Sequence, residues 1–384
     1  MSINLNSHAF ADNPLLRSKP TDPLSPKAAL QALNIRILET NTLSSSSPNF
    51  KVLPFKNSRP LASSTSDSPV PVFQLGWISL EDLKAFFENS GSQLCAEWLV
   101  YLGSSAEDDA VYWAIDVSDH SNLVTELCSR EMGFVALLTL MVASDWEDLQ
   151  AMRNLAIAGH AKALLEWHNI SRFCGHCGGK TVPIEAGRRK QCSNDSCKKR
   201  IYPRVDPAVI MLVIDRENDR ALLASRPKLI PRLWSCLAGF TEPGESLEEA
   251  VRRETLEETS IEVGEVVYHS SQPWPVGPNS IPCQLMVGFF AYAKSLEITV
   301  DKKELEDAQW YSREDVRKAL TFGEYKKSQR NAAVKVEQMC KGVEKSQRLA
   351  ADSNTESEEL APMFVPGPYA IAHHLISSWA FPDP

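Results

Sequence analysis

Four cysteines within residues 174–197 constrain the fold of this chain more than any other feature. Cys174-Gly-His-Cys177 and Cys192-Ser-Asn-Asp-Ser-Cys197 form two short segments separated by fourteen residues. Four soft thiolates on two short turns supply the closed tetrahedral shell that a structural Zn²⁺ prefers. We therefore predict one structural zinc ion bound by Cys174, Cys177, Cys192 and Cys197, with no position left for a catalytic water. The alternatives are two disulfides or a redox-active Cys-x-x-Cys pair.

The composition is typical of a soluble, folded protein. Hydrophobic residues make up 43% and charged residues 23% of the 384 residues, and this length is enough for roughly two to three domains. The other five of the nine cysteines are scattered singly, which argues against a secreted disulfide framework. No apolar run approaches the ~18 residues that a membrane-spanning helix needs. The net charge of −9 argues against bulk binding to nucleic acid or to an anionic membrane.

The pattern along the chain predicts an α+β protein of three parts. Residues 1–168 mix strand-like and helical patterns and form an N-terminal α/β domain, in which the Ser- and Pro-rich residues 41–70 are expected to be a loop. Residues 169–203 contain the cysteine cluster. Residues 204–384 form a third domain, in which the acidic residues 341–361 are expected to be a mobile loop.

The surroundings of the cysteine cluster are basic. Two interpretations stay open: contact with RNA phosphates, or compensation of the thiolate charge by a solvated basic face. The basic residues between Cys174 and Val205 are Lys180, Arg188, Arg189, Lys190, Lys198, Lys199, Arg200 and Arg204.

The second strong feature is a helix with an acidic face. Ser246 followed by Glu249 is a capping box, which predicts that a helix begins there. The side chains that share roughly a 120° arc of this helix change along it from apolar to acidic. They are Leu247, Ala250, Val251, Glu254, Glu257 and Glu258.

Three carboxylates on one face repel each other and also face the negative end of the helix dipole. A cation should compensate them. Arg252 and Arg253 fall elsewhere on the helical wheel, so we expect a divalent ion, and oxygen ligands favour Mg²⁺ or Mn²⁺. The alternative is an ordinary acidic surface helix.

The spacing around this helix resembles the Nudix box. Gly239 is followed by five residues and Glu245, then by seven residues and Arg253-Glu254, then by Glu257-Glu258. The resemblance implies a Nudix hydrolase with an α/β/α sandwich and a mixed sheet. Two positions depart from the family pattern: Thr255 replaces an aliphatic residue, and Ser260 replaces the glycine that ends the helix. A serine in a left-handed cap costs about 1 kcal/mol relative to glycine.

A proline-rich segment follows the helix: Ser271-Gln-Pro-Trp-Pro-Val-Gly-Pro-Asn-Ser280. Its prolines are incompatible with a central strand, and the segment reads as a rigid loop presenting Trp274, or as one that carries a core tryptophan. It resembles the SQPWPFPxS array of the NADH pyrophosphatase subgroup of Nudix hydrolases. Val276-Gly277 replaces the phenylalanine, and extra residues separate the array from Leu285-Met286.

The resemblance to this subgroup extends over nearly the whole chain. A zinc ribbon precedes the Nudix domain in the subgroup, as the cysteine cluster does here. Residues 202–207 (Tyr-Pro-Arg-Val-Asp-Pro) resemble its interdomain junction, and residues 372–376 resemble its closing helix. Residues 10–15 resemble the start of eukaryotic members of a plant-like peroxisomal or plastid type.

The resemblance implies residue roles. The catalytic metals, two or three Mg²⁺ or Mn²⁺ ions, would bind Glu254, Glu257, Glu258 and Glu304 and the carbonyl of Ala238, with Glu257 acting as ligand or base. Glu306 is a weaker match than Glu304. The substrate would contact Tyr202 and Phe240, which would stack on a base, together with Ala238, Gln272, Pro273, Trp274, Pro275, Ser280 and Ala372.

The expected reaction is hydrolysis of the pyrophosphate bond of NADH, and less well of NAD⁺, to reduced nicotinamide mononucleotide and AMP. One alternative is removal of NAD caps from RNA 5′ ends, and another is hydrolysis of ADP-ribose or FAD. An alternative of another class is a non-catalytic adaptor. The subgroup also implies a homodimer, and the lack of a long apolar run predicts no membrane partner. Cytosol is the default location, and plastid and peroxisome are the alternatives.

Overall fold

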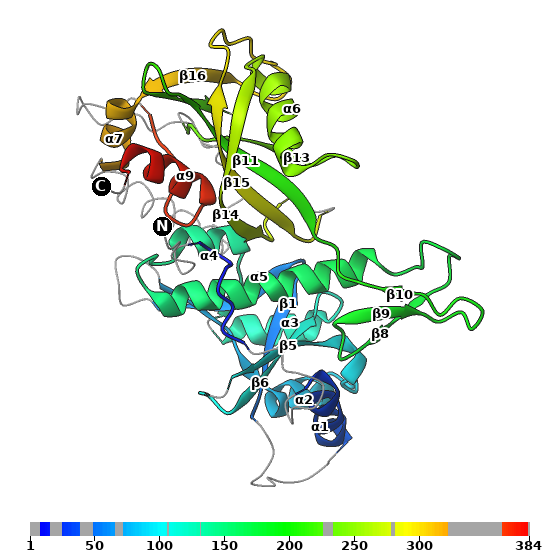
Figure 1. Ribbon diagram of the computed structural model, residues 1–384. Helices are drawn as coiled ribbons and strands as arrows, with labels where there is room; N and C mark the ends of the chain where they lie inside the picture. The colour runs from blue at the N-terminus through cyan, green and yellow to red at the C-terminus, as the bar shows by residue number, and fades with distance from the viewer. Residues whose placement is uncertain are drawn as a thin grey trace.

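The computed structural model describes residues 8–15, 25–38, 49–65, 72–105, 107–130, 132–225, 233–277, 281–321 and 363–382. Figure 1 shows two sheet-containing bodies, with a long helix between them and a small ribbon at the end of that helix. Within these residues, no helix is both long enough and apolar enough to cross a bilayer. The expected mobile loop at 341–361 lies outside them.

The N-terminal body contains a mixed seven-stranded sheet. Five strands follow the order β3-β2-β1-β6-β5, while β4 pairs with β1 and β7 pairs with β2. Strands β1 and β6 are parallel, and the other pairs are antiparallel. The strands are β1 (Asn49–Lys56), β2 (Arg59–Thr65), β3 (Val72–Leu75), β4 (Ile78–Ser79), β5 (Leu99–Ser105), β6 (Ala110–Asp116) and β7 (Met132–Phe134).

Helices cover both faces of this sheet, so alternate side chains of one strand enter two separate cores. In β6, Val111 and Trp113 pack with α1, α2 and α3, whereas Tyr112 and Ala114 pack with α4 and α5. The helices are α1 (Pro26–Leu38), α2 (Leu80–Asn89), α3 (Ser121–Ser129), α4 (Leu137–Ala143) and α5 (Leu149–Ile170), and the short 3-10 helix η2 spans Ala96–Trp98.

The prediction of a loop over residues 41–70 was wrong for its middle part. Strands β1 and β2 occupy 49–56 and 59–65, and they pair with each other next to the turn, where Phe55 faces Pro60. The prediction failed because a serine-rich segment can also form a strand when it is paired with other strands on both sides. Ser63 faces Gln74 of β3 and Met132 of β7.

The cysteine region forms a three-stranded antiparallel ribbon of β8 (Thr181–Ile184), β9 (Arg189–Cys192) and β10 (Arg200–Ile201). Its β8–β9 turn docks on the N-terminal body. The N–H of Tyr101 in β5 donates to the carbonyl of Ala186, and His168 at the end of α5 contacts the carbonyl of Gly187 at 2.6 Å. The ribbon is therefore attached to the end of α5.

The C-terminal body is an α/β/α sandwich, as the Nudix resemblance implies. Its mixed sheet has the order β14-β15-β11-β12-β16, with β13 paired to β11 and with β11 and β15 parallel. Helix α6 packs on one face, and α7 and α9 pack on the other (Figure 1). The elements are β11 (Asp206–Asp215), β12 (Arg220–Ser225), β13 (Leu237–Phe240), α6 (Leu247–Thr259), β14 (Val263–Trp274), β15 (Gln284–Ala293), β16 (Asp307–Ser312), α7 (Arg313–Thr321) and α9 (Ile371–Ala380).

Candidate active site

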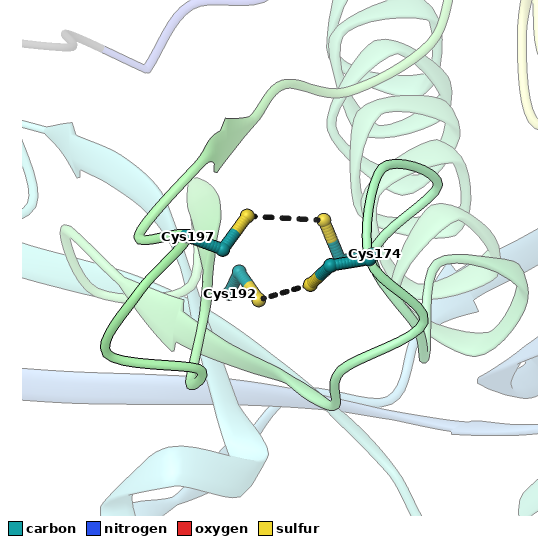
Figure 2. Close-up of side chains that lie close together, drawn as sticks. Cys174, Cys192 and Cys197 are labelled. Carbon is teal, nitrogen blue, oxygen red and sulfur yellow. Dashed lines mark hydrogen bonds between the residues drawn. The ribbon is translucent and has the colours of Figure 1, made fainter.

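The four cysteines of the ribbon lie together. Their sulfur atoms all fall within 4.8 Å of one another, and Figure 2 shows Cys174, Cys192 and Cys197 pointing into one small space between the two knuckles. The Sγ atoms of Cys174 and Cys197 are 3.9 Å apart, and those of Cys177 and Cys192 are 3.4 Å apart. A disulfide needs an S–S distance of about 2.05 Å, so the disulfide alternative does not fit.

The same cluster fits a tetrahedral zinc ion. Zn–S bonds of about 2.3 Å place the sulfurs of such a site about 3.8 Å apart. Hydrogen bonds from the backbone N–H groups of His176 and Cys177 lower the pKa of Cys174 to about 7, whereas burial raises the pKa of Cys192 to about 12. Ionising all four thiols this close together needs a cation, and a closed shell of four cysteines suits a structural zinc ion.

Half of the basic residues around the ribbon have partners inside the chain. Lys190 is buried, and its Nζ donates to the carbonyl oxygens of His168 and Ser171 at 2.9 and 2.8 Å. Three others form ion pairs: Arg189–Glu185, Lys198–Asp195 and Arg204–Asp206. Within the described part of the chain, the remaining four form no ion pair; they are Lys180, Arg188, Lys199 and Arg200.

Helix α6 begins as the capping box predicts. The Ser246 hydroxyl accepts from the Glu249 N–H at 3.2 Å, and the Glu249 carboxylate accepts from the Ser246 N–H at 2.7 Å. The apolar side chains Ala250 and Val251 are fully buried against the sheet. The cap and this apolar face fix how the helix is rotated, and so which side chains follow on the same face.

The carboxylate of Glu254 packs directly on Gly239. A Cβ atom on Gly239 would lie 1.9 Å from the Glu254 carboxyl carbon and 2.1 Å from its Oε1. No side chain can be accommodated there without moving the carboxylate. The glycine of the box therefore creates the space in which this candidate metal ligand lies beside strand β13.

The predicted glutamates differ widely in burial, and within the described part of the chain only the four cysteines form a group close enough to hold a metal ion. Glu258 is 1% exposed and Glu254 is 9% exposed, whereas the side chain of Glu257 is 60% exposed. Burial, and then the nearby charges of Glu257 and Glu304, raise the pKa of Glu254, while Arg253 opposes the shift. Glu304 comes from the segment before β16, which contacts the end of α6 through the Asp301 N–H and the Glu258 carbonyl.

Arg253 corrects one expectation from the sequence. On the helical wheel it points away from the acidic face, but its long side chain turns back to this face. Its guanidinium donates to Glu245, Glu254 and Glu257 at 2.6 to 2.9 Å and to the Phe240 carbonyl at 2.8 Å. The hydrogen bonds from Arg253 to Glu245 lower the pKa of the Glu245 carboxyl to about 2. Arg253 thus supplies part of the compensating charge, which wheel position alone did not show.

The two departures from the Nudix pattern are accommodated. Ser260 adopts the left-handed cap conformation with φ of 61°, as expected for the residue that replaces the family glycine. Thr255 is fully buried, and its hydroxyl donates to the Val251 carbonyl at 2.7 Å. Thr255 therefore takes the place of the aliphatic residue without leaving its buried hydroxyl unbonded.

Several predicted substrate residues converge at one end of the C-terminal sheet. Trp274 of β14 faces Gln284 of β15, and Gln284 faces Asp206 at the start of β11. Phe240 of β13 pairs with Ala208, two residues further along β11. Tyr202, just before β11, and Phe240 are 55% and 41% exposed, which suits aromatic rings available for stacking. Their joint contact with a base remains a prediction.

The proline-rich segment is partly strand. Residues 271–274 end β14 at the sheet edge, where proline is tolerated. Gln272 is fully buried: its Nε2 donates to the carbonyls of Ala9 and Tyr369, and its Oε1 accepts from the Ile371 N–H. Its side chain therefore joins chain segments in this structure. Pro273 faces Leu285 in the same strand pair. Ser280 lies outside the described residues.

The side chains of Ala238 and Ala372 pack in the core on the face of the sheet opposite helix α6. Ala372 is 4% exposed in the core beneath α9, and Ala238 packs against the same core. Cys236 Sγ lies 3.9 Å from the Ala372 carbonyl oxygen. The structure does not bring the Ala372 side chain to the glutamates, so its contact with substrate stays a prediction.

Comparison with known proteins identifies the family. A model described as the NUDIX domain matches residues 204–330, and one described as the NADH pyrophosphatase zinc ribbon domain matches residues 171–202. Nudix hydrolase 19, chloroplastic, of Arabidopsis thaliana is 63% identical over 383 residues, which cover 99% of this chain and 87% of that protein. This chain belongs to the Nudix hydrolase family.

Other relatives match a smaller part. The NAD-capped RNA hydrolase NUDT12 of Macaca fascicularis is 44% identical over 177 residues, covering 44% of this chain and 37% of that protein. The NAD-capped RNA hydrolase NudC of Pseudomonas syringae pv. syringae (strain B728a) is 40% identical over 158 residues, covering 41% of this chain and 54% of that protein. Family membership makes this Nudix protein a hydrolase, and it disfavours the non-catalytic adaptor.

Proposed function

We propose that this Nudix hydrolase cleaves the pyrophosphate bond of NADH, and less efficiently that of NAD⁺, to nicotinamide mononucleotide in the matching redox form and AMP. The observation that supports the proposal is that the charges of Glu257 and Glu304 act on the buried Glu254, in a chain that also has the zinc ribbon of NADH pyrophosphatases. The names of its relatives support substrates that contain NAD.

The charge of the site limits the mechanism. A pyrophosphate brings about two negative charges to a group of carboxylates, and the two would repel without cations. The oxygen ligands of this group suit two or three Mg²⁺ or Mn²⁺ ions, which supply charge neutralisation and polarise phosphate and water when bound. Glu258 and Glu254 would hold them, with the Ala238 carbonyl as a neutral ligand.

The residues of this chain would then orient and activate a water molecule. The water oxygen forms a bond to one phosphorus atom in line with the bridging oxygen, and the bond between phosphorus and that bridging oxygen breaks. A glutamate of the cluster accepts the proton of the water. Glu257, whose side chain is exposed, is the candidate, because Glu254 is assigned to the metals. Arg253 holds both carboxylates within 2.9 Å of its Nη1.

A substrate panel tests the proposal. NADH, NAD⁺, NADPH, ADP-ribose and FAD would each be incubated with the full chain and Mg²⁺ or Mn²⁺, and the products separated by chromatography. We expect NADH to give the highest kcat/KM, with reduced nicotinamide mononucleotide and AMP as products in equal amounts. Absence of NADH cleavage with both metals would show that the proposed substrate is wrong.

The four basic ribbon residues that form no ion pair in the described part of the chain favour a second candidate, removal of NAD caps from RNA by the same chemistry. Binding through phosphates weakens with salt, because each contact releases counterions. The kcat/KM for NAD-capped RNA should therefore fall with salt much more steeply than that for free NADH. Equal salt dependence would remove the support that the ribbon gives to this candidate.

The assembly and the location are part of the same proposal. We infer a homodimer, because members of the subgroup that the chain resembles build their sites from two chains; size-exclusion chromatography with light scattering tests this. The chloroplastic designation of the Arabidopsis relative supports a plastid location over cytosol or peroxisome. A fluorescent fusion of the full-length protein in plant cells tests that inference.

A further inference from the structure

Helix α5 of the N-terminal body contacts the proline-rich segment that is predicted to bind substrate. It runs between the two sheets (Figure 1). Gly159, Lys162 and Glu166 lie three and four residues apart, so they share one face of the helix. Pro275 of the proline-rich segment contacts this face, and its neighbours Trp274 and Val276 pack against the core to which α5 belongs.

Lys162 joins the two bodies through a buried polar contact. It is 9% exposed, and its Nζ lies 2.7 Å from Oε1 of Glu166 and donates to the Pro275 carbonyl oxygen at 2.8 Å. Glu166 is 7% exposed. A buried ammonium is unfavourable unless it is paired and hydrogen-bonded. The pair therefore stabilises one particular position of Pro275 relative to α5.

Close packing surrounds this contact. A Cβ atom on Gly159 would lie 2.9 Å from Cγ of Pro275 and 2.8 Å from Cδ1 of Phe10. The ring of Trp274 meets that of Phe10 edge to face, with centroids 6.0 Å apart. Trp274 and Pro275 are thus held by the N-terminal body in this structure, which differs from an exposed loop that presents Trp274 to a ligand.

Trp274 and Pro275 are connected to the candidate substrate site through the sheet. Trp274 faces Gln284, and Gln284 faces Asp206. The N–H of Asp206 also donates to the Cys283 carbonyl at 3.1 Å. The junction that carries Tyr202 leads directly into Asp206. A displacement of Pro275 would therefore be transmitted to residues 281–284 and to the junction.

We propose that Lys162 is a positioning residue for dinucleotide binding, through which the N-terminal domain holds the proline-rich segment of the substrate site in place. The inference rests on the proposed NADH hydrolysis and extends it to a residue outside the Nudix domain. Its sequence signal is a lysine–glutamate pair four residues apart in an otherwise apolar stretch of helix. The sequence alone gave no indication of what this pair would contact.

Steady-state kinetics of the full chain with Mg²⁺ and NADH test the proposal. Lys162→Met should raise the KM for NADH by about fivefold or more, the effect of one lost hydrogen bond, with kcat within about twofold. Lys162→Arg keeps the charge and donors, so it should restore most of the wild-type KM. Lys51→Met is the matched control: Lys51 contacts Tyr112 in the N-terminal body at 3.2 Å, and its loss should leave KM unchanged.

A double variant separates positioning from stability. Lys162→Met with Glu166→Leu leaves no unpaired buried charge, so its melting temperature should recover towards that of the wild type, while KM stays raised because the Pro275 carbonyl still lacks its donor. If KM recovers together with the melting temperature, or if neither variant changes KM, the inference is wrong. If wild-type protein does not hydrolyse NADH, the proposed function fails, and this inference fails with it.

Discussion

The ribbon thiols and the α6 glutamates both bring ionisable groups near one another, but they differ in how tightly these are grouped, in burial and in compensation. The four sulfurs lie within 4.8 Å of one another, and the ribbon folds around them. The glutamates range from 1% exposed at Glu258 to a 60% exposed side chain at Glu257. Arg253 already compensates part of their charge.

This difference separates a cation that holds the fold from cations that take part in a reaction. A closed shell of four protein ligands leaves no coordination position for water or substrate. A half-open group of carboxylates leaves room for both, and it must accept additional phosphate charge. Substitutions in the two clusters should therefore affect different measurable quantities.

The largest effect on turnover is expected at the buried end of the glutamate cluster. Glu258→Gln keeps the size of the side chain but removes a metal-binding charge, which contributes several kcal/mol at the transition state, so kcat should fall by about 10³-fold. Glu248→Gln is the control, because Glu248 is exposed on the same helix. NADH kinetics and circular dichroism of both variants would check this. Full activity of Glu258→Gln would contradict its role.

A smaller loss of kcat is expected when Glu254 is kept but its carboxylate is pushed aside by a substitution at a neighbouring residue. Gly239→Ala adds a methyl group where the Glu254 carboxylate lies, so we expect kcat to fall by about 10²-fold, as for the loss of a supporting contact to a metal ligand. Gly133→Ala is the control, since a Cβ atom there meets no other atom within 4 Å. Similar kcat values for the two variants would show that the position of Glu254 is not critical.

The ribbon should respond in stability rather than in kcat. Cys197→Ser removes one of four zinc ligands, so the protein should lose its zinc and unfold several degrees lower, while the folded fraction keeps a kcat within about twofold of wild type. Cys128→Ser, at an exposed cysteine, is the control. Zinc content, melting temperature and kcat would be measured together. A large fall in kcat without a loss of stability would contradict the structural role.

The smallest effect is a shift in pH dependence. Burial raises the pKa of Glu254 above its usual value. The carboxylate form, which binds metal, is therefore lost at a higher pH on acidification than for an ordinary glutamate. Because a cation favours the carboxylate, the acid limb of kcat/KM should move to lower pH as Mg²⁺ is raised. Profiles at two Mg²⁺ concentrations check this; an acid limb that does not move argues against a metal at Glu254.

The sequence predicted best where one local pattern determines the geometry. The cysteine spacing, the Ser246–Glu249 capping box and the left-handed Ser260 cap are all present in the structure. Each depends on residues that are close in the sequence. The α/β/α sandwich followed from the resemblance of the box to a known family.

Features that depend on contacts distant in sequence could not be predicted. The strand β2 in the serine-rich region is stabilised by partners on both sides, and propensity does not report such partners. The reach of Arg253 depends on side-chain length rather than on wheel position. The contact between Lys162 and Pro275 joins residues 113 positions apart.

Ion content and turnover measured on one sample test the account most directly. Protein dialysed briefly against EDTA would be analysed for zinc and assayed with NADH, before and after addition of Mg²⁺, Mn²⁺ or Zn²⁺. The account predicts one zinc ion retained per chain, no turnover after dialysis, and recovery with Mg²⁺ or Mn²⁺. If zinc and turnover were lost together and turnover recovered with Zn²⁺ alone, the assignment of a structural zinc to the cysteines and of catalytic Mg²⁺ or Mn²⁺ to the glutamates would be wrong.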